Sequence, residues 1–152
     1  MVFEHDFNAY PELTNTQLEE LRWMSPHPQL EEDFTAEVVK VHDGDTVTLK
    51  TSNRDFSFPL RLHDIDAPEL NEGGEVARDY LAARIVGRLV TILVDRANRV
   101  DKYGRLLGRV VLDGLDMGQE MIHAGLVVPF GRKNEGHVPD QSFFFREGQW
   151  FQ

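Results

Sequence analysis

The sequence contains no cysteine and no long hydrophobic run. Without cysteine the chain forms no disulfide and offers no thiolate ligand to a metal. No segment approaches the roughly 18 consecutive apolar residues that a membrane-spanning helix needs. Residues 1–6 have neither a basic region nor an apolar stretch, so they do not resemble a secretory signal. We therefore expect an intracellular, cytoplasmic protein with no membrane contact.

Positive charge is also scarce. The 152 residues include 16 Lys and Arg against 26 Asp and Glu, a net charge of −10, whereas proteins that bind nucleic-acid backbones are usually basic. The imbalance is concentrated in residues 1–33, which carry one basic and eight acidic residues. Residues 34–132 carry 13 basic and 15 acidic residues and are nearly balanced. The overall charge therefore does not exclude a phosphate-binding site in the middle of the chain.

Residues 1–33 are predicted to form an acidic arm with one short helix. Thr16 and Glu19 have the spacing of a capping box, and the prolines of segment 25–28 end any helix. We expect this arm to lie outside the main fold and to be dispensable for it, and either to weaken nucleic-acid binding or to recruit a protein partner. The alternative is a structural flap, with Leu18 and Leu21 packed onto the rest of the molecule.

Residues 34–132 show the pattern of a small barrel. Apolar residues that alternate with polar ones predict strands. Two segments with apolar residues at helical spacing predict helices, one that begins at Gly-Gly and one that begins at Asp. Val76 is expected on the apolar stripe of the first helix. In chain order these are three strands, a helix, two strands and a helix: 36–41, 45–50, 56–62, 73–87, 89–94, 106–112 and 116–125. This mainly β, α+β order is typical of a five-stranded OB-fold barrel with two or more short helices.

Residues 133–152 are predicted to be an aromatic tail, with phenylalanines at 143–145 and Trp150-Phe151. Such aromatics can stack on bases. Because basic residues are not interleaved with them, we interpret them instead as a cover for the barrel or as a surface for a protein partner.

Three short segments carry side chains suited to phosphodiester hydrolysis. That reaction needs a cation for the phosphate, a base for water, and donors for the charge that develops on the phosphate oxygens. Each segment alone also has an ordinary explanation as a hairpin turn, a surface salt-bridge cluster or an exposed basic loop. The segments are Asp43-Gly44-Asp45-Thr46, the stretch from Arg61 to Glu69, and Asp101-Lys102-Tyr103-Gly104-Arg105.

The middle segment is the most informative of the three. Asp66 and Glu69 lie three residues apart where a strand ends, and Pro68 fixes the backbone between them. A hard cation such as calcium can take the Asp66 carboxylate while Glu69 acts on water. In the third segment, the planar donors of Arg105 can bind two phosphate oxygens.

Taken together and in this order, Asp-Gly-Asp-Thr, Arg-x₄-Asp-x-Pro-Glu and Asp-Lys-Tyr-Gly-Arg resemble the staphylococcal nuclease family over roughly residues 37–128. The resemblance implies a calcium-dependent nuclease that cuts DNA and/or RNA, endonucleolytically and with 3′-phosphate ends. It implies that Asp45, Asp66 and the carbonyl of Ala67 bind calcium. The remaining roles that it implies are general base for Glu69, phosphate clamps for Arg61 and Arg105, and terminal-phosphate contacts for Lys102 and Tyr103.

Some positions depart from the family pattern. Ala67 stands where threonine is common, segment 70–74 is short, and no tyrosines follow Phe130 where the family usually stacks a base. Two other classes compete with the enzyme: a catalytically inactive binding module with this fold, and a docking component of a larger nucleic-acid-handling assembly. Because the carboxylates and arginines of the motif are all retained, we favour the enzyme.

Overall fold

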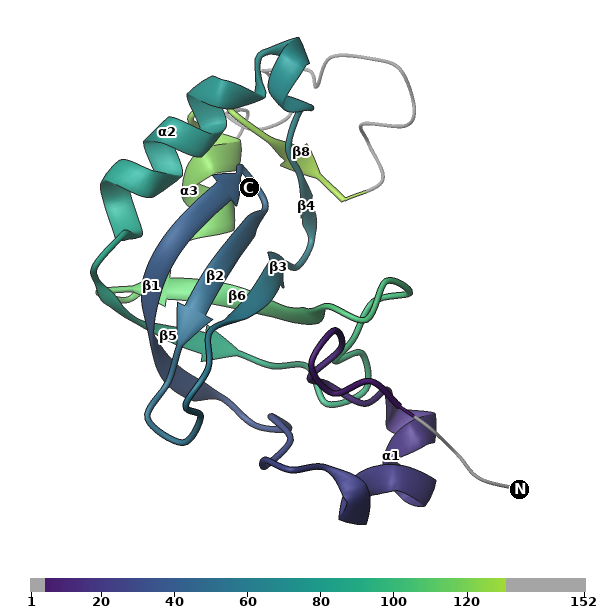
Figure 1. The fold of residues 1–152 in the computed structure, drawn as a ribbon. Helices are drawn as coiled ribbons and strands as arrows, with labels where there is room; N and C mark the ends of the chain where they lie inside the picture. Colours follow the sequence, from purple (N-terminus) through teal and green to yellow (C-terminus); the bar gives the residue numbers. More distant parts are fainter. Residues whose placement is uncertain (1–4, 131–152) are drawn as a thin grey trace.

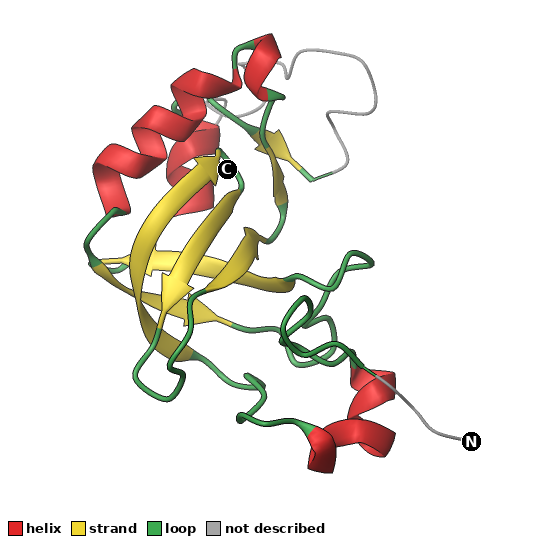
Figure 2. Cartoon of the chain, viewed as in Figure 1, coloured by secondary structure: helices red, strands yellow, loops and turns green. Residues whose placement is uncertain are grey.

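The structure is a computed structural model that describes residues 5–130. The expected tail, residues 133–152, lies outside the described residues. Figure 1 shows the order of the elements along the chain, and Figure 2 separates helices from strands. The strands are β1 (Phe34–Asp43), β2 (Thr46–Lys50), β3 (Phe58–Leu62), β4 (Ile65–Asp66), β5 (Leu89–Leu93), β6 (Leu106–Leu112), β7 (Leu115–Asp116) and β8 (Val128–Pro129). The helices are α1 (Asn15–Leu21), η1 (Arg22–Met24), η2 (Leu70–Glu72), α2 (Gly74–Ile85) and α3 (Met117–His123).

Five strands close into a barrel. The hydrogen-bonded order is β3-β2-β1-β5-β6, and a parallel pairing between β3 and β6 joins the two ends. The other pairings in the barrel are antiparallel. The prediction of a five-stranded OB-type barrel with short helices is confirmed. The short pairs β6–β7 and β4–β8 were not predicted.

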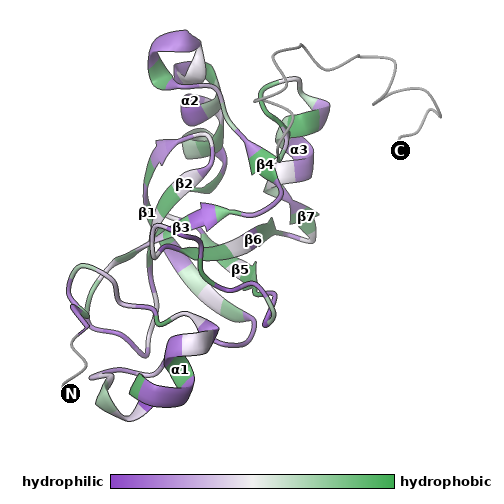
Figure 3. Ribbon diagram, turned by 90° about the vertical axis from the view of Figure 1, so that its right-hand side faces the viewer, coloured by the Kyte–Doolittle hydropathy of each residue, from purple (hydrophilic) through white to green (hydrophobic). Residues whose placement is uncertain are grey.

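The strands form where the sequence alternates, because successive side chains of a strand point to opposite faces. In β3, Phe58, Leu60 and Leu62 are buried while the residues between them are exposed or half-buried. Figure 3 shows hydrophobic residues along much of β5 and β6 and hydrophilic stretches on α1 and α2. Burial of these strand side chains, together with the inner faces of α2 and α3, forms one core.

Helices α2 and α3 cover one end of the barrel, as Figure 1 shows. Ala77, Leu81 and Ile85 of α2 are buried, as the periodicity predicts, but Val76 is 61% exposed. The expectation for Val76 was therefore wrong: it lies one position away from the stripe that faces the core. The Asp116 side chain caps α3 by accepting a hydrogen bond from the Gln119 amide at 3.1 Å.

The N-terminal arm lies at the opposite end of the barrel in Figure 1. Its helix begins earlier than predicted, because the capping box is formed by Thr14 and Gln17 rather than by Thr16 and Glu19. Leu18 and Leu21 pack with Leu13 in a small cluster of their own, separate from the barrel core.

A buried ionic cluster joins the arm to the barrel. Glu12, only 3% exposed, is ion-paired with both Arg54 and Arg99, which are 5% and 2% exposed. Arg54 also lies 4.6 Å from the centroid of the Phe58 ring. Removing these charges from water costs free energy, which their pairing offsets, so loss of one partner is strongly destabilising. The division into arm, barrel and tail stays a prediction, but the arm has polar contacts deep inside the molecule.

Among the described helices, none is long and apolar enough to cross a membrane.

Candidate active site

Strand register brings the first two motif segments together. β2 pairs with β3 so that Thr46 lies opposite Arg61, and the Asp45 carbonyl accepts a hydrogen bond from the Leu62 amide at 2.7 Å. The turn before β2 is held by Asp43, whose carboxylate accepts from the Asp45 amide at 3.0 Å. Asp45 therefore lies beside Arg61 on the mouth of the barrel.

The glycine of the Asp-Gly-Asp motif is required by packing. A β-carbon at Gly44 would lie 2.7 Å from the β-carbon of Ala67 and 2.8 Å from that of Ala77. No side chain fits between this turn, the segment after β4 and α2. The close approach places Asp45 next to Ala67, whose amide donates to the Asp45 carboxylate at 2.9 Å.

Two of the predicted metal ligands, Asp45 and Asp66, lie beside the guanidinium group of Arg61. Nη2 of Arg61 lies 2.6 Å from Asp66 Oδ1 and 3.5 Å from Asp45 Oδ2. Its Nη1 donates to the Ile65 carbonyl at 2.9 Å, which fixes the plane of the guanidinium group. The side chains of Arg61, Asp45 and Asp66 are between 11% and 13% exposed, so solvent screens these charges only partly.

Burial raises the pKa of the Asp45 carboxyl, and a hydrogen bond with the Asp43 side chain raises it further. The Ala67 amide and the charge of Arg61 act in the opposite direction. A carboxylate whose ionised form is disfavoured in this way is stabilised when a cation approaches it.

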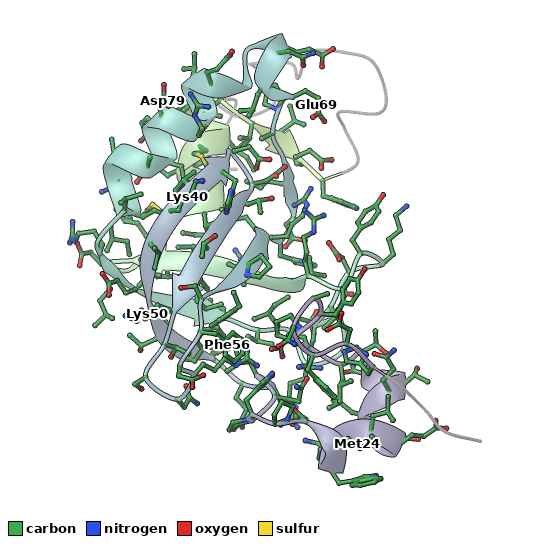
Figure 4. All side chains as sticks on the ribbon, in the orientation of Figure 1. Met24, Lys40, Lys50, Phe56, Glu69 and Asp79 are labelled. Carbon is green, nitrogen blue, oxygen red and sulfur yellow. The ribbon has the colours of Figure 1, made fainter. Side chains whose placement is uncertain are left out.

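Glu69 lies just after β4, in the short turn that leads into α2, and Figure 4 labels it there. Its carbonyl accepts hydrogen bonds from the amides of Glu72 and Gly74 at 2.8 and 2.9 Å. A β-carbon at Gly74 would lie 2.3 Å from the Pro68 carbonyl oxygen, so α2 starts directly against this turn. The Glu69 backbone is thereby fixed, while the residue itself is exposed toward solvent.

The third motif segment, Asp101–Arg105, lies near Arg61 because the pairing of β3 with β6 closes the barrel. Arg61 of β3 is aligned with Leu107 of β6, two residues after Arg105. The Asp101 carboxylate accepts hydrogen bonds from the Tyr103 and Arg105 amides and from Arg105 Nε, each at 2.9 Å. Arg105 is thereby oriented by a side chain of its own loop.

These segments line one groove of about 780 Å³. It includes Asp45, Asp66, Arg61, Glu69, Lys102, Tyr103 and Arg105. Ala67 is buried beneath it and contacts it through the hydrogen bond to Asp45. The groove also contains Asp43, Asp64 and Asp101, so six carboxylates face three Lys and Arg side chains. An acidic groove of this kind repels a phosphate backbone unless a cation neutralises it.

The donor set suits a hard cation. Asp45 and Asp66 supply carboxylate oxygens and already share one positive group, and calcium prefers oxygen ligands. Within residues 5–130, no three Asp, Glu or His side chains gather as a ready-made metal site. Two carboxylates and one backbone carbonyl would leave the other positions to water and substrate, so the residues fit calcium at modest affinity.

Two positioning residues were not assigned a role from the sequence. Asp43 orders the Asp45 turn, and Asp101 holds Arg105. The same signal exists for both, because an Asp whose carboxylate accepts from the amide two residues later suits an Asx turn: Asp43 before Asp45, and Asp101 before Tyr103. Phe130 also lines the groove, with its ring centroid 5.7 Å from the Arg61 guanidinium carbon.

Comparison with known proteins agrees with the fold. The family described as "Staphylococcal nuclease homologue" matches residues 59–143, a range that contains the Arg61–Glu69 and Asp101–Arg105 segments. An "Uncharacterized endonuclease" of Escherichia coli O157:H7 is 36% identical over 113 residues, covering 73% of this chain and 71% of the relative. A "Micrococcal nuclease" of Shigella flexneri is 39% identical over 79 residues, covering 51% of this chain and 42% of the relative.

A closed five-stranded barrel with an acidic, arginine-flanked groove at its mouth defines the structural class. With the family matched over more than half of its length, the chain belongs to the staphylococcal nuclease family and is a phosphodiester-hydrolysing nuclease.

Proposed function

We propose that this protein is a calcium-dependent nuclease that hydrolyses phosphodiester bonds of DNA and/or RNA by in-line attack of water. The proposal includes endonucleolytic cleavage that leaves 3′-phosphate ends. The observation that carries it is the groove itself: side chains from three separate sequence segments line one cavity, and two carboxylates converge on a single cationic atom.

Asp45, Asp66 and the Ala67 carbonyl are the proposed calcium ligands. A calcium ion bound there supplies positive charge to the phosphate and draws electron density from phosphorus. The distances around Arg61 support this assignment, because both carboxylates already approach one positive group. The raised pKa of Asp45 supports it as well, since a site that disfavours its own negative charge gains most from a cation.

Glu69 is the proposed general base. It lines the groove from a turn with a fixed backbone, close in sequence to the Asp66 ligand. In this role its carboxylate orients the attacking water and accepts its proton as the oxygen–phosphorus bond forms. The bond from phosphorus to the leaving 5′-oxygen breaks on the opposite side, that oxygen takes up a proton from water, and the product keeps its phosphate on the 3′ side.

Arg61 and Arg105 are the proposed clamps on the phosphate oxygens that gain charge in the transition state. Each is oriented by a carboxylate, Asp66 for Arg61 and Asp101 for Arg105. Lys102 and Tyr103, at the tip of the Arg105 loop, are the proposed contacts to a terminal phosphate. The Lys102 ammonium lies 5.3 Å from the Tyr103 ring centroid, so both side chains occupy the same rim of the groove.

The test is cleavage of supercoiled plasmid and of single-stranded RNA by the full chain, in calcium and in excess chelator. We expect cleavage in calcium, none in chelator, and 3′-phosphate ends that a phosphatase removes before end-labelling. Glu69→Gln is the control for contaminating nuclease. Retention of binding without any cleavage would instead support the binding-module alternative.

A further inference from the structure

The arm packs against the segment that leads to Arg105. In Figure 1 the first part of the arm lies beside the long connection between β5 and β6. Contacts run along this connection: the Asp33 carboxylate accepts from the Val94 amide at 2.8 Å, and the Asn15 side-chain amide donates to the Arg96 carbonyl at 2.7 Å. The arm therefore contacts the start of the β5–β6 connection at Val94 and again at Arg96.

Arg99 is the deepest of these contacts. Although it belongs to the β5–β6 connection, it is 2% exposed, and its guanidinium group points into the arm. It donates to the carbonyls of Leu30 and Leu13 at 2.9 and 3.0 Å and pairs with the Glu12 carboxylate at 3.1 Å. The Arg99 carbonyl accepts from the Leu107 amide at 2.7 Å. The same residue thus joins the arm to the start of β6.

Tyr10 contacts the tip of the Arg105 loop. A β-carbon at Gly104 would lie 2.6 Å from Tyr10 Cδ1, so the ring lies directly on the glycine backbone. Gly104 has φ +83°, a conformation that glycine adopts without strain. Both the backbone geometry and the ring contact therefore favour glycine between Tyr103 and Arg105.

These contacts form a continuous path to a proposed phosphate-binding group. Arg99 holds the base of the loop, Tyr10 holds its tip, and Asp101 between them fixes Arg105. Interatomic positions at such a site matter, because misplacement by about 1 Å can cost roughly 10²-fold in rate.

We propose that the N-terminal arm braces the Arg105 loop, with Tyr10 and Glu12 as positioning residues for the phosphate-binding side of the groove. The proposal rests on the proposed function for its catalytic consequence, but the bracing itself is a property of the fold. It also gives the acidic arm a role other than repelling nucleic acid: the carboxylate of Glu12 balances the buried charge of Arg99.

The test compares Tyr10→Ala, Tyr10→Phe and Trp23→Ala in the full chain. Tyr10→Phe keeps the ring contact with Gly104, whereas Tyr10→Ala removes it. Trp23 is a matched control, an 81% exposed arm aromatic whose indole nitrogen donates to the Glu20 carbonyl. The readouts are amide hydrogen exchange of residues 99–106, and kcat and KM for a single-stranded DNA oligonucleotide in calcium.

For Tyr10→Ala we expect faster exchange in residues 99–106 and a roughly tenfold lower kcat with KM changed less than about twofold, because Arg105 acts on charge that develops in the transition state. Tyr10→Phe should restore both, and Trp23→Ala should change neither. Unchanged exchange in Tyr10→Ala overturns the brace, as does a normal kcat despite faster exchange. An equal effect of Trp23→Ala also overturns it.

If the wild-type chain cuts nothing, the proposed function fails, and hydrogen exchange alone decides the brace: faster exchange in Tyr10→Ala than in Tyr10→Phe supports it, and equal exchange overturns it.

Discussion

Arg61 occupies an unusual position, since its guanidinium nitrogen lies between the two proposed calcium ligands. It neutralises Asp45 and Asp66 at a place where a divalent cation is expected to compete with it. Replacing Asp45 and replacing Glu69 should therefore have different effects. In the proposed mechanism Asp45 binds the cation, whereas Glu69 acts on water.

For Asp45→Ala we expect calcium affinity to fall by more than about tenfold, since one of the two proposed carboxylate ligands is lost. For Glu69→Gln we expect calcium affinity close to wild type and turnover lower by about 10²–10⁴-fold, the typical contribution of a general base. Calcium affinity is measured by titration, with the melting temperature as the readout, and turnover is measured as kcat on plasmid DNA. If the two variants titrate alike, the assignment of ligand and base is wrong.

Arg105→Lys keeps the charge but loses the forked donors. We expect kcat to fall by about 10²-fold, as for loss of one transition-state donor, with little change in melting temperature. Arg109→Lys is the matched control, because Arg109 lies on the outer side of β6, is paired with Asp116, and does not line the groove. Equal losses in the two variants, measured on one oligonucleotide, would contradict the phosphate-clamp role.

At the scale of elements, one polar cluster ties the two helices that cap the barrel. Glu120 of α3 accepts hydrogen bonds from Tyr80 at 2.7 Å and from Arg84 at 2.6 and 2.8 Å, both on α2. The hydrogen bond from Arg84 lowers the pKa of Glu120, with a further contribution from Tyr80. Because α2 also packs against Pro68, this cluster supports the turn that carries Glu69.

Glu120→Gln should lower stability at pH 7 by roughly 1.5–3 kcal/mol, the range for a hydrogen bond to a charged group. The folded-state pKa is lowered, so the stabilisation is complete above the unfolded value of about 4.3 and is lost as the pH falls through the folded value. Urea unfolding of both proteins at pH 7 and below pH 4 measures this. Glu37→Gln, an exposed carboxylate on β1, is the control; a Glu120→Gln difference that does not shrink in acid would contradict the assignment.

The position of α1 illustrates the limit of local signals. Thr14-x-x-Gln17 and Thr16-x-x-Glu19 both match a capping box, and the structure uses the first. The choice places Leu18 and Leu21 against Leu13, which is fully buried. Local spacing allows either start, and packing of the apolar residues selects one.

At the scale of the whole molecule, the arm and the barrel share the buried charges of Glu12, Arg54 and Arg99. Burial lowers the pKa of both arginines, and the Glu12 charge opposes that effect. Among the described residues, Arg54 Nε and Nη1 have no hydrogen-bond partner. The cluster already has one more positive than negative charge, so it has little tolerance for losing its only carboxylate.

Glu12→Gln should therefore destabilise the protein by about 3–5 kcal/mol, as expected when one partner of a buried ion pair is removed. Removal of residues 1–33 should likewise lower the melting temperature, contrary to the expectation of a dispensable arm. Glu32→Gln, whose side chain is 82% exposed, is the control. Thermal melts of the three proteins test this, and a truncated chain that melts like the full one would restore the independent arm.

Much of the barrel was predictable because its signals are local. Segment 106–112, rich in Leu and Val, was predicted as a strand with the observed bounds of β6, and Asp116 with Gly125 framed α3. Val76 was misplaced because a helix with weak amphipathicity leaves the direction of its buried face to its neighbours.

By itself, the sequence determined the order of the five barrel strands and of the two helices that cover them, and the residue types available for phosphodiester chemistry. Both are encoded in short-range periodicity and in motifs of a few residues. Only the tertiary structure decided which charges meet: Arg61 with two carboxylates, Glu12 with two arginines, and Tyr10 with Gly104. Such contacts join residues up to 94 positions apart. They depend on barrel closure and on how the arm packs, because the energy of a charge pair depends on distance and burial, which no local pattern records.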